Sequence, residues 1–323
     1  MDGTLDLEMD GKRYFYKMNV IPQLHKFLVG QGGSVKQQLE QNSGARIEIP
    51  GKQSKSEIVT ISADKQQPIY SAKAQIELLL EKEELKLRPT HFLTIPLNFP
   101  AVQDRYMKFK NAVGEKRYDG IGDDIFMKVA RLHFTLCCLK LHTPKQKEAA
   151  ITSFERGLEK VKEAIKDPVN FDLRGLYIMN DDPKSVNVIY TTDTNPKISE
   201  TVNRICDIFF EEFRQAGIIT NKDLHRQRAL DTSGVSADIK LHCTLLNTKY
   251  RDTSQSDVHM EGEEAENAQA SGGSRRKVDA AQMIEDFANF SFGQFKAGNI
   301  ALCNIMDFGN DGFYNPLSTG MLF

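Results

Sequence analysis

The chain has 323 residues, of which 40% are hydrophobic and 27% charged, and its formal net charge is −2. No apolar run reaches the roughly 20 residues that a membrane-spanning helix needs, and the first residues lack the basic and apolar regions of a signal peptide. The five cysteines show no zinc-binding or redox spacing. We therefore expect an intracellular protein with reduced thiols, long enough for two domains and without a metal or cofactor.

The first ninety residues have the periodicity of a small α+β domain. Apolar and polar residues alternate over 14–20, as in a strand, and 24–28 have helical spacing. The glycine-rich stretch 30–33 separates this helix from a second one, with Ser34 as the expected N-cap and Gly44 as the C-cap. Two further strands and a closing helix are expected at 46–49, 58–61 and 68–85.

The glycine stretch reads Gly30-Gln31-Gly32-Gly33 and joins two helices. Glycines let a nucleic-acid backbone approach closely, and the following helix N-terminus offers amide donors and a positive dipole end. With its flanking elements, the region 13–88 resembles a KH domain of the eukaryotic type, which leaves 1–12 as an N-terminal tail. The resemblance implies that single-stranded RNA, or single-stranded DNA, binds along the loop in a groove for about four nucleotides.

The middle positions of the loop are Gln31 and Gly32, where KH domains that bind strongly often have basic residues. We expect the nearby cations Lys26, Lys36 and Arg46 to take their place. The surrounding region is locally basic, which favours a polyanionic partner. A KH fold used for protein contacts is the alternative.

From residue 92 onward, strands and helices alternate in a second, larger region. Strand-like segments are expected at 92–97, 171–179 and 186–191, and helical ones at 102–113, 151–165 and 198–213. The mixture predicts an α+β fold in which helices cover largely antiparallel sheets. Residues 252–276 are polar and acidic and predict a long mobile loop. A short helix near 283–287 and phenylalanine-rich strands are expected after it.

The pattern His-x-Thr occurs twice, as LHFTL over 132–136 and as LHCTL over 241–245, with the two histidines 109 residues apart. A repeat at a fixed offset suggests a duplicated unit. In a strand, each His and its Thr project to one side and the leucines to the other. Two such strands side by side would place four polar side chains in one cleft, with the two imidazoles as a base and an acid near neutral pH. These side chains are His133, Thr135, His242 and Thr244.

The domain 89–323 resembles the 2H phosphoesterase superfamily, bilobal enzymes named for two H-x-[ST] motifs. The resemblance implies metal-independent chemistry at RNA phosphodiester bonds or 2′,3′-cyclic phosphate ends. One histidine would deprotonate the attacking water or 2′-hydroxyl, and the other would protonate the departing oxygen. Thr135 and Thr244 would hold nonbridging phosphate oxygens. Which of His133 and His242 is the base stays open.

Two further residues are candidates to line the cleft. His91 imitates the motif with Thr94, but the spacing is wrong for a common strand face, so it is expected to be structural or at most to line the cleft. Arg251 follows the second motif and would either reach a phosphate or remain a solvated surface residue.

The order of the two domains resembles that of a nuclear subunit of a transcription-coactivator and alkylation-repair complex. The resemblance implies an RNA-binding phosphodiesterase whose partners are single-stranded RNA and the other subunits, including a helicase. Two alternatives stay open. One is a non-catalytic RNA- or protein-binding scaffold whose 2H cleft binds a nucleotide without turnover. The other is an enzyme that hydrolyses a small cyclic nucleotide and uses the KH domain only for location.

Overall fold

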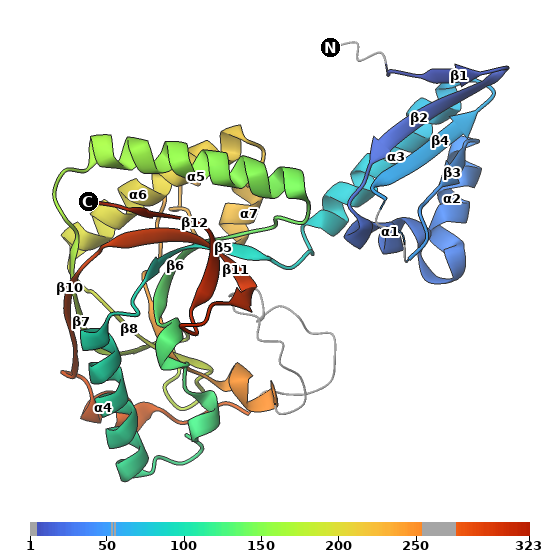
Figure 1. Cartoon of the computed structure of the whole chain (residues 1–323). Coiled ribbons are helices and arrows are strands. Elements are labelled where there is room, and N and C mark those ends of the chain that lie inside the picture. Colours follow the sequence, from blue (N-terminus) through green and yellow to red (C-terminus); the bar gives the residue numbers. More distant parts are fainter. Residues whose placement is uncertain (1–4, 53, 55, 254–275) are drawn as a thin grey trace. The chain divides into compact units, whose positions relative to one another are not determined.

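The computed structural model describes residues 5–52, 54, 56–253 and 276–323. The chain divides into two compact units, Met1–Arg88 and Pro89–Phe323, shown in Figure 1. Most of the acidic loop predicted at 252–276 lies outside the described residues. Among the helices of the described part, none combines the length and apolar character needed to cross a membrane.

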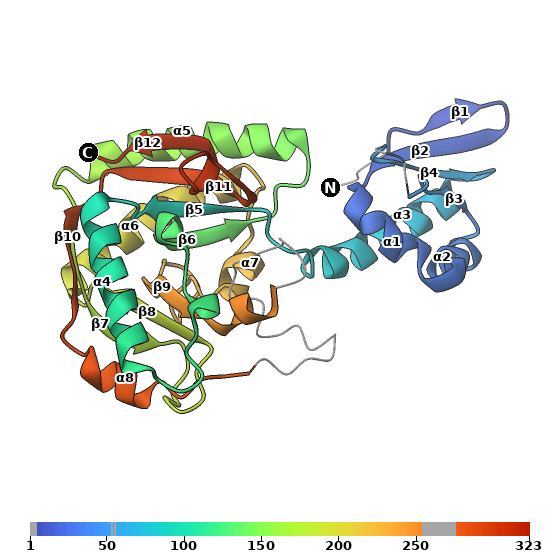
Figure 2. The same cartoon turned by 60° about the horizontal axis from the view of Figure 1, so that its bottom comes forward.

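The first unit is a four-stranded antiparallel sheet with strand order β1-β2-β4-β3. Three helices cover one face of the sheet (Figure 2), and the buried apolar side chains of sheet and helices form one core. The elements in chain order are β1 (Glu8–Asp10), β2 (Arg13–Asn19), α1 (Pro22–Val29), α2 (Ser34–Ser43), β3 (Arg46–Glu48), β4 (Ile58–Ala63) and α3 (Gln66–Glu84). This is the predicted α+β arrangement.

Part of the segment predicted to be an N-terminal tail is a strand instead. β1 pairs with β2 through a tight hairpin in which Asp10 faces Arg13. Gly11 lies in the turn at φ +60°, a conformation that glycine adopts at little cost. All three residues of β1 are exposed, so no alternation of apolar residues marks the strand. The signal was the Asp10-Gly11 pair, which is typical of hairpin turns.

The helix after the glycine loop begins one residue earlier than predicted. Ser34 is already helical, and Gly33 is the N-cap at φ 84° without a side-chain cap. The expectation that Ser34 caps the helix was wrong, because the 3₁₀ turn Gln31–Gly33 leads directly into α2. The C-cap is confirmed: Gly44 has φ 74°, and its N–H donates to the carbonyl of Glu40.

The second unit contains two four-stranded sheets in which all neighbouring strands are antiparallel, as predicted. One sheet has the order β12-β11-β5-β6 and the other β10-β7-β8-β9. The two His-x-Thr segments therefore belong to the outer strands β6 and β9, and these strands contact each other. The strands are β5 (His91–Pro96), β6 (His133–Leu139), β7 (Asn170–Ile178), β8 (Val188–Thr192), β9 (Cys243–Asn247), β10 (Ser291–Lys296), β11 (Asn299–Phe308) and β12 (Tyr314–Met321).

Helices pack on both sheets of this unit. α5 contacts α6 and β12, α4 contacts β10, and α8 contacts β7 (Figures 1 and 2). Buried side chains of both sheets and of these helices form one continuous apolar cluster. A shared, densely packed core holds the two sheets in a fixed relation. The helices are α4 (Pro100–Lys116), α5 (Pro144–Ala164), α6 (Pro196–Gln215), α7 (Asn221–Arg226) and α8 (Ala281–Asp286).

The two long helices start in the same way. Thr143 caps α5 and forms a capping box with Gln146, and Pro144 is the first helical residue. Asn195 caps α6 ahead of Pro196. A capping side chain satisfies an otherwise unpaired amide, and proline at the first position is already in a helical conformation. Local sequence therefore sets both helix starts.

A glycine decides how closely these helices pack. A Cβ at Gly157 of α5 would lie 2.7 Å from Phe209 Cδ1 of α6, whereas a Cβ at Gly114 of α4 would meet nothing within 4 Å. We expect Gly114→Ala to stabilise the protein by about 0.5–1 kcal/mol through helix propensity. Gly157→Ala should destabilise the protein by about 1–2 kcal/mol, because the overlap of the new methyl group with Phe209 outweighs the gain in helix propensity. Thermal unfolding of both variants tests this, and a higher melting temperature for Gly157→Ala would contradict it.

Candidate active site and nucleic-acid-binding loop

The two His-x-Thr motifs have the same backbone geometry. His133 is the first residue of β6, and His242 directly precedes β9. In both strands the register with the neighbouring strand shifts immediately after the motif threonine, so that Leu136 and Leu245 are the extra residues. A β-bulge of this kind redirects side chains and is common beside active sites. The repeat seen in the letters is thus also a repeat in structure.

Strand alternation buries one side of each motif. Leu132 and Phe134 are buried in the first copy, as are Leu241 and Cys243 in the second. The motif threonines, on the other side of the strands, are only half-buried. His133 is buried and His242 half-buried. The apolar side chains anchor the strands in the core, so the polar side chains face away from it.

The same ring nitrogen orients both imidazoles. Nδ1 of His133 lies 2.7 Å from the carbonyl oxygen of Arg131, and Nδ1 of His242 lies 2.6 Å from that of Lys240. A carbonyl oxygen only accepts hydrogen bonds, so Nδ1 carries a proton in each ring. Nε2 is then the atom that gains or releases a proton. In the first motif, Nε2 lies 3.1 Å from Oγ1 of Thr135.

Aromatic side chains hold each imidazole in place. His133 meets Tyr314 edge-on, with ring centroids 5.4 Å apart, and also contacts Phe92 at 5.1 Å. His242 meets Tyr190 edge-on at 5.7 Å. Both tyrosine rings are buried. Each histidine therefore has a tyrosine from another strand of its own sheet as a packing wall.

Hydrogen bonds connect the segment before the first motif to the strand of the second motif. The carbonyl of Leu245, at the bulge of β9, accepts from the amide of Met127 at 2.8 Å. The hydroxyl of Tyr106 lies 2.6 Å from the carbonyl of Met127 and 3.1 Å from that of Leu245. Met127 lies six residues before His133. Burial raises the pKa of Tyr106 well above its ordinary value, so this hydroxyl stays protonated and remains a donor. The segment that leads into the first motif is thus tied to the second.

The glycine loop of the first unit contains three glycines with positive φ: 70° at Gly30, 60° at Gly32 and 84° at Gly33. A Cβ at Gly30 would lie 2.5 Å from Val35 Cγ2, so the first position also requires glycine for packing. Gln31 and Gly32 are exposed at the tip. The tip and the amides at the start of α2 are therefore open to an anionic backbone.

The three predicted cations lie on different elements. Lys26 is exposed on α1 and lies 4.8 Å from the ring centre of Phe27. Lys36, in the first turn of α2, is 3.6 Å from Glu40, and Arg46 of β3 is 3.3 Å from Glu48. The pair of Arg46 is exposed and that of Lys36 is half-buried. Ion pairs open to solvent contribute little to stability, so a phosphate can compete for Arg46 in particular. Lys26 and Lys36 flank the loop in sequence, whereas Arg46 lies on the outer strand of the sheet.

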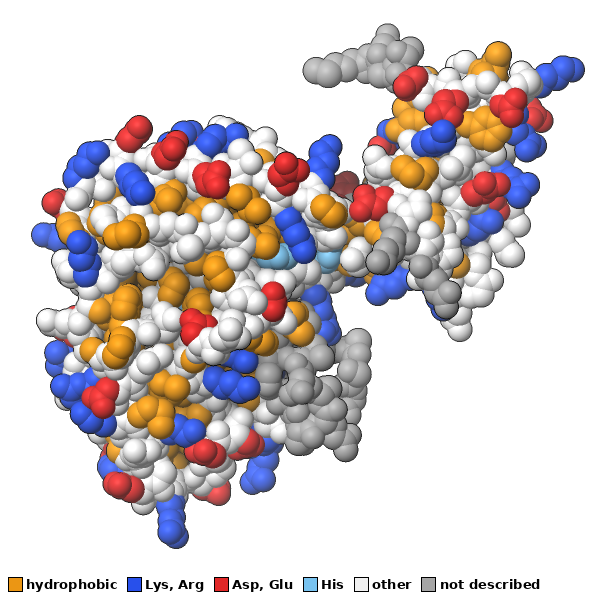
Figure 3. Space-filling view, in the orientation of Figure 1, with side chains coloured by type: hydrophobic (Ala, Val, Ile, Leu, Met, Phe, Trp, Pro, Cys, Tyr) orange, Lys and Arg blue, Asp and Glu red, His pale blue; other side chains and the backbone are white. Residues whose placement is uncertain are grey.

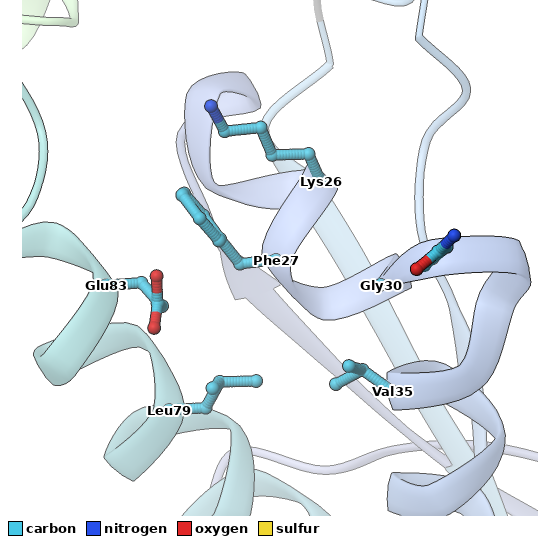
Figure 4. A pocket seen from close by; sticks show the side chains of 7 residues that line it. Lys26, Phe27, Gly30, Val35, Leu79 and Glu83 are labelled. Carbon is cyan, nitrogen blue, oxygen red and sulfur yellow. The ribbon is translucent and has the colours of Figure 1, made fainter. Parts of the chain in front are cut away.

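A pocket of about 470 Å³ adjoins the loop between α1 and α3. Figure 4 shows Phe27, Val35 and Leu79 around it, with the carboxylate of Glu83 at one side. Lys26 also lines the pocket, and Glu83 is paired with Lys86 at 2.7 Å. An apolar floor that suits a planar base therefore lies beside a cation that suits a phosphate. Sequence analysis missed Leu79 and Glu83, because α3 is distant from the loop in the chain.

Comparison with known families identifies both units. Residues 89–322 match the family model described as "AKAP7 2'5' RNA ligase-like domain", and residues 16–78 match the KH domain model. The chain belongs to the AKAP7 2'5' RNA ligase-like domain family. It therefore combines a KH domain with a 2H phosphoesterase-like domain, as the sequence motifs predicted.

One curated relative covers both domains. Activating signal cointegrator 1 complex subunit 1 of Mus musculus is 28% identical over 310 residues, which are 92% of this chain and 80% of the mouse protein. Two solved structures resemble single domains. The first KH domain of human vigilin is 20% identical (28% of this chain, 90% of that chain, TM-score 0.23). E. coli LigT with 3'-AMP is 13% identical (73% and 99%, TM-score 0.40).

His91 does not lie with the motif histidines. On the paired strands β5 and β6, His91 faces Leu139 at one end, while His133 faces Pro96 at the other. Five residues of strand separate them, or about 17 Å. His91 is 1% exposed, and its Nδ1 lies 2.8 Å from Thr90 Oγ1. Of the two roles expected for His91, a structural one and a place in the lining of the cleft, these contacts favour the structural one.

Burial, which is the largest cause, and the charges of Lys147 and His142 together lower the pKa of His91 to about 4. The folded state then binds a proton less readily than the unfolded state, so stability is complete above pH 6.5 and falls as the pH drops towards 4. Between pH 8 and pH 5 we expect the protonation of His91 to lower the free energy of unfolding by about 2 kcal/mol.

Unfolding by urea at pH 8 and pH 5 tests this expectation with His91→Gln. The variant should lose about 2 kcal/mol less stability on acidification than the unchanged protein. His225→Gln changes an exposed histidine and is the matched control. An identical pH dependence in His91→Gln and the unchanged protein would refute the assignment.

Arg251 is also engaged elsewhere. It follows the far end of β9 from His242. Its guanidinium pairs with Asp124 at 3.3 Å and donates to the carbonyls of Gly120 and Arg276. These contacts fasten three loop segments together, so Arg251 supports the loops at that end of the sheet and does not line the cleft.

Sequence analysis missed the side chains that hold the histidines. Tyr190 is on β8, Tyr314 on β12 and Tyr106 on α4, and no motif connects them to the histidines. Tyr190 had one usable signal, since strands joined through a helix in a duplicated unit often become neighbours. Tyr314 had none, because 181 residues separate it from His133.

Proposed function

We propose that the protein is an RNA-binding phosphodiesterase that cleaves RNA phosphodiester bonds, or opens 2′,3′-cyclic phosphate ends, without a metal ion. One observation carries the proposal. Two imidazoles, each held by Nδ1 on a backbone carbonyl and each presenting Nε2, lie on the neighbouring outer strands of two sheets. This arrangement suits paired acid and base catalysis at one phosphate.

In the proposed reaction, the neutral imidazole takes a proton at Nε2 from a 2′-hydroxyl or a water molecule. The oxygen attacks phosphorus, and the protonated imidazole gives its Nε2 proton to the departing oxygen. The hydroxyls of Thr135 and Thr244 donate to the nonbridging oxygens and offset the charge that builds up there. His133 and His242 exchange roles between transfer and hydrolysis, as microscopic reversibility requires.

The KH domain supplies RNA affinity in this proposal. Its loop and the start of α2 offer amide donors, with Lys26 and Lys36 beside them. Tethering a strand that is already bound raises its effective concentration at the second domain. We expect this to lower KM for oligonucleotides more than for mononucleotides.

We further propose that the protein works in the nucleus as a subunit of an activating signal cointegrator complex. Its partners there would be the other subunits, among them a helicase, in transcriptional coactivation and alkylation repair. The support is the similarity to the mouse subunit over 92% of the chain. Co-purification of the tagged protein from nuclear extract with and without nuclease tests this membership.

The decisive test of the activity is incubation of end-labelled RNA oligonucleotides with the full chain in excess EDTA. Cleavage that persists supports metal-independent catalysis, and cleavage abolished by EDTA contradicts it. Binding without cleavage of any oligonucleotide or cyclic phosphate end would favour the non-catalytic scaffold. Turnover confined to small cyclic nucleotides would favour the second enzymatic alternative.

A further inference from the structure

The motif repeat extends further upstream than the histidines. Arg131 precedes His133 by two residues, and Lys240 precedes His242 by two. Both copies therefore read basic-Leu-His-x-Thr-Leu. The carbonyls of these two basic residues are the groups that orient the imidazoles. Backbone and charge are thus placed together in both lobes.

Arg131 is held against aromatic rings near His133. Its guanidinium carbon lies 3.6 Å from the ring centre of Phe308 and 5.9 Å from that of Tyr314. Its Nε donates to the carbonyl of Gly312 at 3.3 Å. A guanidinium that rests on a ring face keeps its charge and its unused N–H donors. Tyr314 is also the ring that packs on His133.

Lys240 repeats this arrangement in the other lobe. Its ammonium lies 5.4 Å from the ring centre of Tyr190, the ring that packs on His242. Beside each of the two motifs, a cation and an imidazole thus lie against the same tyrosine ring. Within the described residues, no carboxylate forms an ion pair with Arg131 or Lys240, so both charges are available to an anion.

We infer that Arg131 and Lys240 bind the phosphates on either side of the scissile one, so that the preferred substrate is an internal phosphodiester of a single-stranded polynucleotide. The inference rests on the proposed function and names its substrate class. Each cation precedes its imidazole by two residues, a separation along the chain of at most about 7 Å. That offset is on the order of one nucleotide step. The imidazoles and threonines serve the central phosphate, and the cations serve its neighbours.

The test compares a substrate that has flanking phosphates with one that has none. A 5′-phosphorylated trinucleotide has three phosphates, so its central phosphodiester has one on each side and can use both cations, whereas a nucleoside 2′,3′-cyclic phosphate can use neither. We expect Arg131→Gln and Lys240→Gln each to lower kcat/KM for the trinucleotide by roughly tenfold or more. The loss on the cyclic phosphate should be much smaller than the loss on the trinucleotide, because no flanking phosphate is present and both backbone carbonyls that orient the imidazoles are kept.

Conservative and matched controls accompany the two variants. Arg131→Lys and Lys240→Arg keep the charge and should retain most of the kcat/KM for the trinucleotide. Lys197→Gln removes an exposed lysine at the start of α6 and should change neither substrate. Equal losses on both substrates, or losses no larger than that of Lys197→Gln, would overturn the inference.

A binding measurement separates this inference from the proposed activity. A 2′-deoxy oligonucleotide lacks the attacking hydroxyl and reports binding alone. Each charge-removing variant should reduce the slope of log K against log salt concentration by about 0.7, the value for one phosphate contact on a single strand. If the unchanged protein never cleaves RNA, the proposed activity fails while a reduced slope still supports the cation contacts. An unchanged slope overturns them even if cleavage occurs.

Discussion

Replacement of either motif histidine by alanine is expected to lower the rate of RNA cleavage by about 10²–10⁴-fold, the usual contribution of a positioned acid or base. His133→Ala and His242→Ala each remove one Nε2, and neither remaining imidazole can supply both proton transfers. The double variant should be little slower than the single ones, because the two groups act as one unit.

Single-turnover cleavage of a labelled oligonucleotide in EDTA measures this effect. His225→Ala, which removes an exposed histidine from α7, is the control and should cleave at the unchanged rate. The unchanged protein should show a bell-shaped pH profile, whose two limbs belong to the pair and not to either residue alone. Each single variant should lose one limb. Rates within tenfold of the unchanged protein in either variant would rule out the acid and base roles.

Two added carboxylates in the glycine loop are expected to lower the affinity for single-stranded RNA by about 100-fold, because like charges placed against a phosphate cost several kcal/mol. The variant is Gln31→Asp with Gly32→Asp. Gln31 and Gly32 are both exposed, and aspartate tolerates the positive φ at Gly32 better than most residues do. Binding is measured by fluorescence anisotropy, and turnover of a nucleoside 2′,3′-cyclic phosphate should be unchanged.

The matched control adds the same two charges elsewhere in the KH domain. Gln66 and Gln67 are exposed in the first turn of α3, where carboxylates favour the helix dipole. Gln66→Asp with Gln67→Asp should therefore fold at least as well and bind RNA almost as tightly. Equal losses of affinity in the two double variants would show a general charge effect and contradict a phosphate site at the loop.

Features that depend on neighbouring residues were predictable from the sequence. The glycine loop, the cap at Gly44 and the repeated His-x-Thr letters all express steric rules or strand alternation over a few residues. Predictions failed where the local signal was weak or ambiguous. β1 has no buried face to mark it, and Ser34 has the right chemistry for a cap but already lies inside the helix.

The burial of the candidate residues, and the residues that they contact, were not predictable in this way. His91 and His133 begin similar strand segments, yet antiparallel pairing puts them at opposite ends of β5 and β6. Arg251 was expected either to reach a phosphate or to remain solvated, but its bonds to Asp124 and two carbonyls place it among loops. Antiparallel register and long-range contacts decide such cases, and neither is visible in a short window of sequence.

By itself, the sequence determined the two domain types and the residues that carry the candidate chemistry, because alternation, glycine conformations and the repeat are local properties of the chain. Only the tertiary structure decided that β6 and β9 are neighbouring outer strands, that Tyr314 and Tyr190 pack on the two imidazoles, and that Arg131 and Lys240 repeat the same contact. These relations join residues as many as 183 positions apart. They arise because two sheets bury their apolar faces in one core, which brings their outer strands β6 and β9 together.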